Sequence, residues 1–365
     1  MMQPHEIIMI YGSNPFEMTT KLLEQCDIIS SVPKTASIVL KPNLVVASPP
    51  ENGATTHPEI VEAIIIYLRN NGYKHISIVE SSWVGESTAR AFKAHGYDKF
   101  VKEHGVTLVD VKKDRYEAIT MHGFPIEISK TILDADYLIN LPVLKGHCQT
   151  TITCALKNMK GCISDRSKRQ FHTWGLHKPI AALNAIRKAD LVIVDSINGD
   201  LDFEEGGNPV QTNRMFAGLD SVLIDTFGAS LMGYSVHEIP YLTQAENYGV
   251  GTTDLFKLNY RTLNKDLPAE SYTPSGRVEK LATYTAPLSA CSACYGNLIH
   301  ALGRLEEQGL LGHLKHKIHI GQGYKAKSGD NIGVGVCTKG LANSLAGCPP
   351  KALDMLQFIK NNLKN

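Results

Sequence analysis

The segments CSAC at 291–294 and GCPP at 347–350, with Cys337 between them, contain four of the eight cysteines of this 365-residue chain. Apolar residues recur at helical spacing over 295–307, directly after the first segment, and they predict a helix there. The first cysteine pair therefore stands at the start of a predicted helix, where the positive helix end stabilises the charge of thiolates.

The other two cysteines also lie at predicted boundaries. An apolar run over 332–336 predicts a strand that ends at Cys337. Pro350 follows Cys348 closely and favours the first turn of a helix over 350–363. Four thiolates brought together from such boundaries can hold one cofactor. Iron–sulfur clusters take four cysteines, and a Cys-Pro pair commonly completes the set.

Two other interpretations of the four cysteines remain open. Structural zinc also accepts four thiolates, but its ligands usually come as two close pairs, whereas ten residues separate Cys337 from Cys348. Alternatively, the four are unconnected core residues, because a free cysteine often behaves as a small buried hydrophobe.

The order Cys-x-x-Cys, Cys, Gly-Cys-Pro-Pro resembles the proximal [4Fe-4S] site of nickel–iron hydrogenase small subunits. The last element is also similar to the corresponding segment of the related complex I subunit. The resemblance covers 291–363 at most. It implies that one [4Fe-4S] cluster is bound by four residues: Cys291, Cys294, Cys337 and Cys348.

Composition limits the class of protein. The net charge of +1 gives no reason to expect nucleic acid or a membrane surface as a partner. No apolar run approaches the roughly 18 residues of a membrane-spanning helix, and the first residues lack a signal-peptide pattern. Eight cysteines without export favour reduced thiols or metal ligands over disulfides. We therefore expect a cytoplasmic protein.

Short apolar runs alternate with helical patterns over the first 250 residues. Strands are predicted over 7–11, 37–40, 74–79, 106–109, 137–141 and 191–194, and helices over 58–71 and 86–95. This alternation predicts an α/β fold with a mostly parallel sheet and helices on both faces. No G-x-G-x-x-G dinucleotide fingerprint follows an early strand. A polar, proline-containing stretch over 257–277 predicts a linker, so we expect a domain over 1–260 and a smaller C-terminal α/β lobe with the cysteines over 261–365.

Polar residues follow one predicted strand after another. In parallel sheets such residues meet beyond the carboxyl ends of the strands, and lysines there neutralise carboxylate or phosphate while histidines bind metal or transfer protons. Taken singly, each could be solvated or simply hydrogen-bonded. Together they predict a site for a small anionic or polar ligand. The predicted catalytic residues are Lys41, His57, Lys145, His147 and Lys157, and the predicted ligand-binding residues are Asn43, Thr56, Glu80, Asn158, His172 and Asp195. Thr55 or Thr56 is expected to cap the helix that begins at Pro58.

These clusters resemble the DUF362 family, whose members are often described as iron–sulfur cluster-binding. The resemblance covers about 36–250 and rests on the segments Lys41-Pro42-Asn43, Thr56-His57-Pro58, Glu80-Ser81, Lys145-Gly146-His147, Ala155-Leu156-Lys157-Asn158-Met159-Lys160-Gly161, Val194-Asp195 and Leu223-Ile224-Asp225. Two features differ: Asn208-Pro209 replaces a Gly-Pro pair, and ferredoxin-type cysteine runs are absent. The resemblance implies a fold and a cofactor class but no substrate.

Three functions follow as hypotheses. The first is an iron–sulfur redox protein or oxidoreductase that acts on the ligand of the first domain and exchanges electrons with a protein partner. The second is a ligand carrier with a structural cluster. The third is a hydrolase or lyase whose divalent ion is held by histidines and by Glu80, Asp195 and Glu205. Four further cysteines are expected in the core or lining a site: Cys26, Cys148, Cys154 and Cys162.

Overall fold

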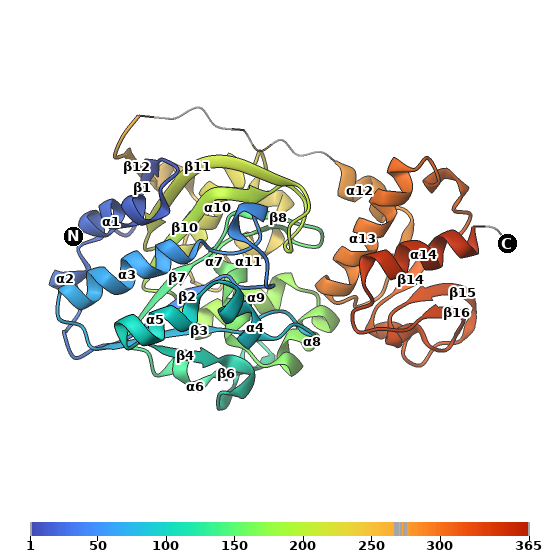
Figure 1. The fold of residues 1–365 in the computed structure, drawn as a ribbon, viewed down its shortest axis with the longest axis horizontal. Coiled ribbons are helices and arrows are strands. Elements are labelled where there is room, and N and C mark those ends of the chain that lie inside the picture. Colours follow the sequence, from blue (N-terminus) through green and yellow to red (C-terminus); the bar gives the residue numbers. More distant parts are fainter. Residues whose placement is uncertain (1, 266–269, 271, 273–275, 364–365) are drawn as a thin grey trace. The chain divides into compact units, whose positions relative to one another are not determined.

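The computed structural model describes residues 2–265, 270, 272 and 276–363. It divides into two compact units. The first comprises the described residues of 1–168 and 177–274, and the second those of 169–176 and 275–365. Each unit contains its own sheet, with all or most neighbouring strands parallel (Figure 1).

The first unit is built on an eight-stranded sheet. Its strands in spatial order are β12 (Asn259–Thr262), β1 (Glu6–Tyr11), β11 (Pro209–Gly218), β10 (Leu191–Asp200), β7 (Tyr137–Leu141), β2 (Ser37–Pro42), β3 (His75–Glu80) and β4 (Thr107–Asp110). The strands from β10 to β4 are parallel, whereas β11 runs antiparallel to both of its neighbours. The predicted mostly parallel sheet is therefore confirmed.

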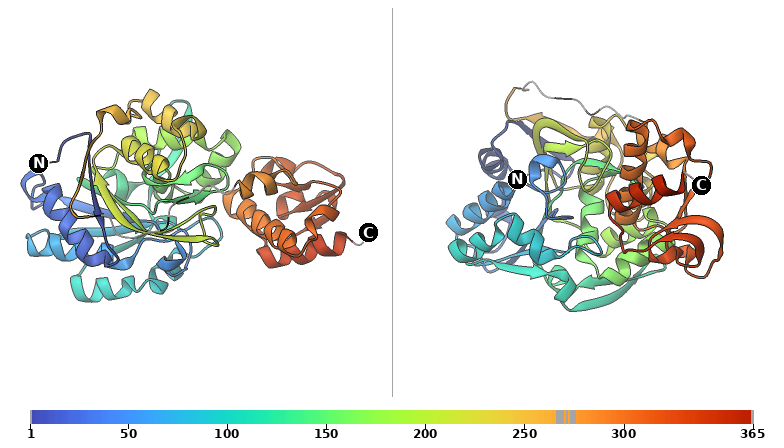
Figure 2. Two further views of the ribbon diagram at one scale, coloured as in Figure 1. Left: turned by 90° about the horizontal axis from the view of Figure 1, so that it is seen from above. Right: turned by 45° about the vertical axis from the view of Figure 1, so that its right-hand side comes forward.

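Helices cover both faces of this sheet (Figures 1 and 2). One face holds α1 (Pro15–Cys26), α3 (Pro58–Asn70), α4 (Thr88–Ala94) and α5 (Tyr97–His104), and the other holds α7 (Ala155–Asn158), α9 (His177–Ile186), α10 (Ser221–Leu231) and α11 (Pro240–Asn247). Shorter or peripheral helices are α2 (Ile28–Ser31), α6 (Lys130–Leu133) and α8 (Asp165–Trp174). The hydrophobic core beneath the first group is continuous from α1 to β3, and Cys26 is buried in it as expected.

Helix α3 shows how the sequence determines this arrangement. Its apolar residues recur at helical spacing and are buried against the sheet, and Pro58 occupies the first turn. The predicted threonine cap is wrong: His57 is the N-cap residue, and Thr56 Oγ1 instead donates to Leu141 O at 2.7 Å. Thr55 Oγ1 donates to Ser48 O at 2.9 Å. Both threonines thus fasten the loop before α3 to other segments.

Two small antiparallel hairpins were not expected. They are β5 (Tyr116–Met121) with β6 (Phe124–Ser129), and β8 (Lys145–His147) with β9 (Thr151–Thr153). The first closes through His122-Gly123, where both residues have positive φ, as the tight hairpin turn requires. In the second hairpin, the polar segment Lys145–His147 that follows β7 forms a short strand.

The second unit is a four-stranded parallel sheet with helices gathered on one side (Figure 1). The strands in order are β13 (Thr285–Pro287), β14 (Ile318–Ile320), β15 (Gly329–Val334) and β16 (Leu341–Leu345), and the helices are α12 (Arg277–Ala282), α13 (Ser292–Glu307) and α14 (Ala352–Asn362). The predicted smaller α/β lobe is confirmed. Three boundaries differ: β15 ends before Cys337, which lies in a 3-10 turn, α13 begins earlier than predicted, and α14 begins later.

The predicted linker over 257–277 is only partly described, because residues 266–269, 271 and 273–275 lie outside the described chain. Its first part includes β12, which pairs with β1 and crosses the predicted domain boundary between residues 260 and 261. The division into independently folding domains at 260/261 stays a prediction. In the described part of the chain, no helix has the length and apolar character needed to cross a bilayer.

Candidate functional site

The four C-terminal cysteines gather at one edge of the small sheet. Because its strands are parallel, their carboxyl ends meet at a common edge. Cys291 follows β13 and is the N-cap residue of α13, and Cys294 lies in the first turn of that helix. Cys337 follows β15 and Cys348 follows β16. The fold thus brings the four cysteines together although Cys291 and Cys348 lie 57 positions apart in the sequence.

The thiols are close enough to affect one another's ionisation. Burial raises the pKa of Cys294 to about 12, and the neighbouring thiols of Cys291, Cys348 and Cys337 add to the rise. Burial also raises the pKa of Cys337, an effect that the nearby Lys325 ammonium opposes. Because proximity makes full ionisation of all four costly, such a quartet suits a cation or cluster that neutralises the thiolates.

The spacing of the thiols distinguishes between metals. A tetrahedral zinc site with Zn–S bonds of about 2.3 Å holds its sulfur atoms about 3.8 Å apart. Among the described residues, which include all eight cysteines, no three cysteine sulfur atoms lie within 4.8 Å of one another. An iron–sulfur cluster is a larger body than a zinc ion and takes thiolates that lie further apart.

A glycine keeps space free beside the quartet. Gly335 has φ +93°, and a Cβ on it would lie 3.3 Å from Cys294 Sγ. Residues with a side chain rarely adopt this backbone conformation. Glycine at 335 therefore allows both the turn after β15 and the close approach of the Cys294 sulfur. The residues therefore fit a cluster.

Sequence reasoning missed Gln322, which follows the remaining strand, β14. Its side-chain nitrogen donates to Cys291 Sγ at 3.6 Å and to Arg169 O at 2.9 Å. All four strand ends thus contribute a residue to this edge. The apolar triplet before Gly321-Gln322 was the available signal, because it indicates a strand end like the others.

In the first unit, Lys41 and Glu80 form a buried ion pair at the ends of β2 and β3. The Lys41 ammonium also donates to Pro42 O at 2.8 Å and reaches Asn158 Oδ1 at 3.5 Å. A Cβ on Gly161 would lie 2.6 Å from the ammonium and 2.3 Å from Glu80 Oε1. The Lys-Asn-x-x-Gly segment therefore packs directly on the ion pair.

Lys145 is also fully buried, but it contacts neutral oxygen atoms. Its ammonium donates to Ala54 O, to Glu204 O at 2.6 Å and to Asn43 Oδ1 at 3.5 Å. Burial lowers the pKa of Lys145 to about 7, although the carboxylate of Glu204 opposes this. The predicted Lys145 and Asn43 therefore lie together.

His147 and Lys157 meet on one carboxylate. Lys157 Nζ lies 2.5 Å from Glu204 Oε2, and His147 Nε2 lies 3.1 Å from the same atom. His147 Nδ1 accepts bonds from the amides of Gln149 and Thr150, so its proton is on Nε2. Burial, with the charge of Lys157, lowers the pKa of His147 to about 4. His147 thus contacts Glu204 as a neutral imidazole, a partnership that the sequence did not reveal.

His57 and Asp195 form a second charged group. His57 Nδ1 and Asp195 Oδ2 are 2.7 Å apart, and the same oxygen accepts from the His57 amide at 2.9 Å. Burial lowers the pKa of His57, but the charge and hydrogen bond of Asp195 outweigh it and hold the pKa above its ordinary value. Among the described residues, His57 Nε2 has no hydrogen-bond partner, which leaves it available to a ligand.

A fourth buried lysine, Lys168 in α8, was not predicted. Its ammonium donates to Ser81 O at 2.8 Å, Ser81 Oγ at 2.6 Å and Ser82 O at 2.9 Å. Burial lowers its pKa to about 8, opposed by Glu80. His172 lies further along the same helix, in the part that clusters with the second unit rather than with the strand ends.

Three of the further cysteines, Cys148, Cys154 and Cys162, have the properties of core residues. Cys154 and Cys162 are buried, and Cys148 is partly buried. Burial raises the pKa of Cys162 to about 12 and holds those of Cys148 and Cys154 well above the ordinary value. All three are therefore protonated thiols near neutral pH.

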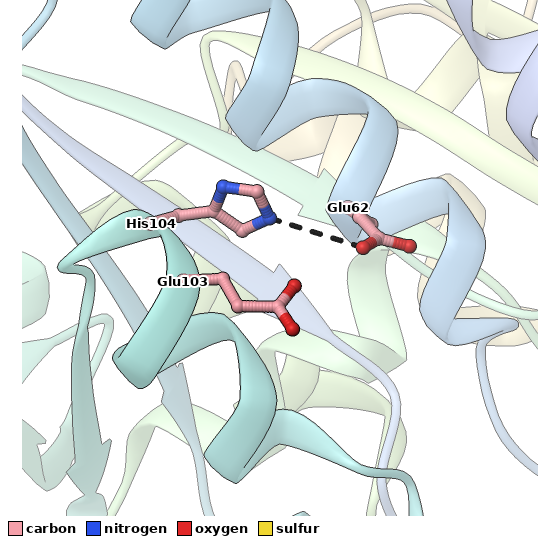
Figure 3. Close-up of side chains that lie close together, drawn as sticks. All are labelled: Glu62, Glu103 and His104. Carbon is pink, nitrogen blue, oxygen red and sulfur yellow. Dashed lines mark ion pairs between the residues drawn. The ribbon is translucent and has the colours of Figure 1, made fainter.

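Among the described residues, no closely spaced group of three possible ligands includes Glu80, Asp195 or Glu205, so the structure does not gather the residues proposed for a divalent ion. Glu80 instead pairs with Lys41, and Asp195 pairs with His57 alone. Among the described residues, the closely spaced group of possible ligands is instead Glu62, Glu103 and His104 (Figure 3). Lys99 Nζ lies 3.2 Å from Glu62 and 3.6 Å from Glu103. This lysine offsets part of the charge of the two carboxylates, and we interpret the group as an ion-pair cluster between α3 and α5.

The family match lies mainly in the first unit. Residues 38–230 match the family described as "Domain of unknown function (DUF362)". A thylakoid-associated protein of Synechocystis sp. is 26% identical over 229 residues, which are 59% of this chain and 69% of that protein.

Two solved structures are similar at lower levels. The lactate racemase apoprotein from Thermoanaerobacterium thermosaccharolyticum aligns with a TM-score of 0.43 and 17% identity over 64% of this chain and 57% of that one. A Thermotoga maritima protein aligns with a TM-score of 0.38 and 14% identity over 66% and 60%. The chain thus spans less than two thirds of either structure. The family match covers more than half of the chain, and the chain therefore belongs to the DUF362 family.

Proposed function

We propose that this protein is an iron–sulfur redox protein or oxidoreductase. Cys291, Cys294, Cys337 and Cys348 would hold one [4Fe-4S] cluster, and the first unit would bind a small anionic or polar ligand at its strand ends. Such a cluster supplies one-electron transfer when bound. The eight cysteines are free thiols, which supports a reducing compartment such as the cytoplasm.

The observation behind the cluster is the convergence of four thiols at one sheet edge. Each comes from a separate strand end or from the adjoining helix start, and Gly335 leaves room beside Cys294. The thiols are close enough to affect one another's ionisation, and no three of their sulfur atoms, all in described residues, form the compact group that a zinc tetrahedron requires. This combination favours a cluster over a single zinc ion.

The ligand class follows from the charges in the first unit. Glu80 neutralises Lys41 and Glu204 neutralises Lys157, so these two lysines serve chiefly to hold the strand ends together. Lys145 contacts neutral oxygen atoms, and His57 is held towards its protonated form by Asp195. A carboxylate or phosphate ligand would favour the protonated form of Lys145, whose pKa burial lowers to about 7. His57 could transfer a proton at Nε2.

Single substitutions test the cluster assignment. Each of the four cysteines is changed to Ser, and Cys26→Ser in the core of the first unit is the matched control. Iron, acid-labile sulfide and zinc are then measured on protein purified without oxygen. We expect about four irons per chain in the parent and the control, and a loss of iron in each of the four variants. One zinc per chain in a colourless parent would contradict the proposal.

A further inference from the structure

A serine and a lysine in the first unit form a buried pair that the proposed function does not use. Ser81 directly follows β3, and Lys168 lies in the first turn of α8. Ser81 Oγ and Lys168 Nζ are 2.6 Å apart, and both residues are buried. This distance lies in the range over which a general base takes the proton of a nucleophilic hydroxyl. The location of the proton between the two atoms decides what the pair can do.

The remaining contacts of Lys168 Nζ accommodate a neutral amine. They are two carbonyl oxygens, Ser81 O at 2.8 Å and Ser82 O at 2.9 Å, and carbonyl oxygens only accept hydrogen bonds. An ammonium donates to both carbonyls and to the Ser81 hydroxyl. A neutral amine donates its two N–H groups to the carbonyls and keeps its lone pair for the hydroxyl proton. Lys168 can therefore lose its proton without leaving a donor or an acceptor unpaired.

The surroundings of Lys168 make the neutral form accessible near neutral pH. Burial lowers its pKa to about 8, and the charges of Lys112 and Lys41 add to this effect, whereas Glu80 and Asp165 oppose it. Asp165 Oδ1 lies 3.9 Å from Nζ, and Glu80 is bound to Lys41. About one tenth of Lys168 is thus neutral at pH 7, against about one part in a thousand for an ordinary lysine.

The backbone that carries the serine is fixed by buried side chains. Ser82 Oγ donates to Leu44 O at 2.7 Å, and Lys112 Nζ donates to Trp83 O at 2.9 Å. These bonds hold the segment directly after Ser81 on both sides. A hydroxyl in such a segment keeps its orientation towards the base, as a nucleophile requires.

We propose that Ser81 is a nucleophile activated by Lys168, and that the pair hydrolyses a small ester or amide. Ser81 Oγ attacks the acyl carbon while Lys168 Nζ takes its proton, and Lys168 gives this proton to the departing alcohol or amine. Water then attacks the acyl-enzyme, loses a proton to Lys168 and releases the carboxylic acid and the free hydroxyl. A serine with a lysine base is a known arrangement for acyl transfer. Ser81 is 4% exposed, so the substrate has to be small. This activity is separate from the proposed cluster.

The test uses diisopropyl fluorophosphate, a small reagent for activated serines, on the full chain. Ser81 Oγ forms a bond to phosphorus, fluoride leaves, and Lys168 takes the proton, so the protein gains one diisopropylphosphoryl group that peptide mass spectrometry locates. Ser81→Ala removes the nucleophile. Ser167→Ala is the matched control, because Ser167 is also buried and adjoins Lys168 in the sequence, but its Oγ accepts from the Glu127 amide at 3.0 Å.

We expect an adduct at Ser81 in the parent and in Ser167→Ala, and none in Ser81→Ala. The labelling rate should rise about tenfold from pH 7 to pH 9 as Lys168 loses its proton. Lys168→Met should slow labelling by about 100-fold or more. If this variant fails to fold, the pH dependence of the parent decides. Hydrolysis of p-nitrophenyl acetate, a small ester, should fall to the uncatalysed rate in Ser81→Ala.

Two results would overturn the inference. A folded parent without an adduct at Ser81 would show that the hydroxyl is not activated. An adduct whose rate changes neither with pH nor in Lys168→Met would show that Lys168 only holds the two carbonyl oxygens. Iron does not enter these measurements, so a parent without iron that is still labelled at Ser81 would refute the proposed function alone.

Discussion

The ion pair between Lys41 and Glu80 offers a quantitative test of the first unit. The two side chains are 0% and 4% exposed, so neither charge can be solvated by water when its partner is removed. Breaking a buried pair on one side costs about 3–5 kcal/mol, because the remaining charge stays buried. Lys41→Met should therefore destabilise the first unit by about 3–5 kcal/mol.

The double variant separates an ion pair from a ligand-binding lysine. Glu80→Gln keeps the shape of the side chain, and Lys41→Met keeps much of its length. With both charges removed, the loss in free energy of unfolding should be smaller than that of Lys41→Met alone. The loss in the double variant should fall short of the sum of the two single losses by about 2–3 kcal/mol. An unpaired lysine that serves only a ligand would show almost additive effects.

The assay is urea unfolding followed by tryptophan fluorescence. The chain has two tryptophans, and Trp83 lies in the first unit close to β3. A Trp174→Phe background makes Trp83 the reporter for that unit, and all four proteins of the cycle share this background. A cost below about 1 kcal/mol for Lys41→Met, or additive costs in the double variant, would refute the buried ion pair.

Three further predictions concern the cysteine edge and the charged histidine. Gln322→Leu removes the hydrogen bond to Cys291 Sγ, and such a bond to a ligand sulfur stabilises the reduced state of a cluster. The midpoint potential of the cluster should therefore fall by about 20–40 mV in a spectroelectrochemical titration. An unchanged potential would contradict the contact. Gly335→Ala forces a side chain into positive φ at a cost of about 1–2 kcal/mol and should reduce the iron content; full iron occupancy would show that the space is not needed. His57 should titrate above its ordinary pKa in ¹⁵N-histidine NMR, and Asp195→Asn should lower that pKa, while His147 stays neutral from pH 6 upward as an internal control. The stability from protonated His57 is complete below about pH 6.5 and lost as the pH rises through the raised pKa. A His57 pKa that Asp195→Asn leaves unchanged would refute the pair.

Much of this architecture could be predicted because it depends on local pattern. Apolar runs alternate with amphipathic helices, and this alternation determines a parallel sheet whose strand ends meet. The positions of Lys41, Lys145 and the cysteine edge follow from that rule. The hairpin at His122-Gly123 was missed although its turn residues were visible, because His is a less familiar residue at positive φ than Asn or Asp.

The partners within the site were not predictable in the same way. Glu204 binds Lys157 across 47 residues of sequence, and Lys168 reaches Ser81 across 87. Such pairings depend on how loops from different strands fold over the sheet edge, which no local period determines. The lysines at the strand ends and Glu80 were therefore recognised as site residues, whereas the pairing of Glu80 with Lys41 and of Glu204 with Lys157 was not. In the structure each lysine is bound by a carboxylate, and this ion pairing explains why Lys41 and Lys157 are buried.

The most direct test of the central claim is the electron paramagnetic resonance spectrum of protein purified without oxygen, measured before and after reduction with dithionite. If the four thiols hold a cluster, we expect no signal from the oxidised protein and, on reduction, the signal of one reduced [4Fe-4S] cluster per chain, which Cys294→Ser should abolish. A protein that contains stoichiometric zinc and remains without a signal after reduction would contradict it.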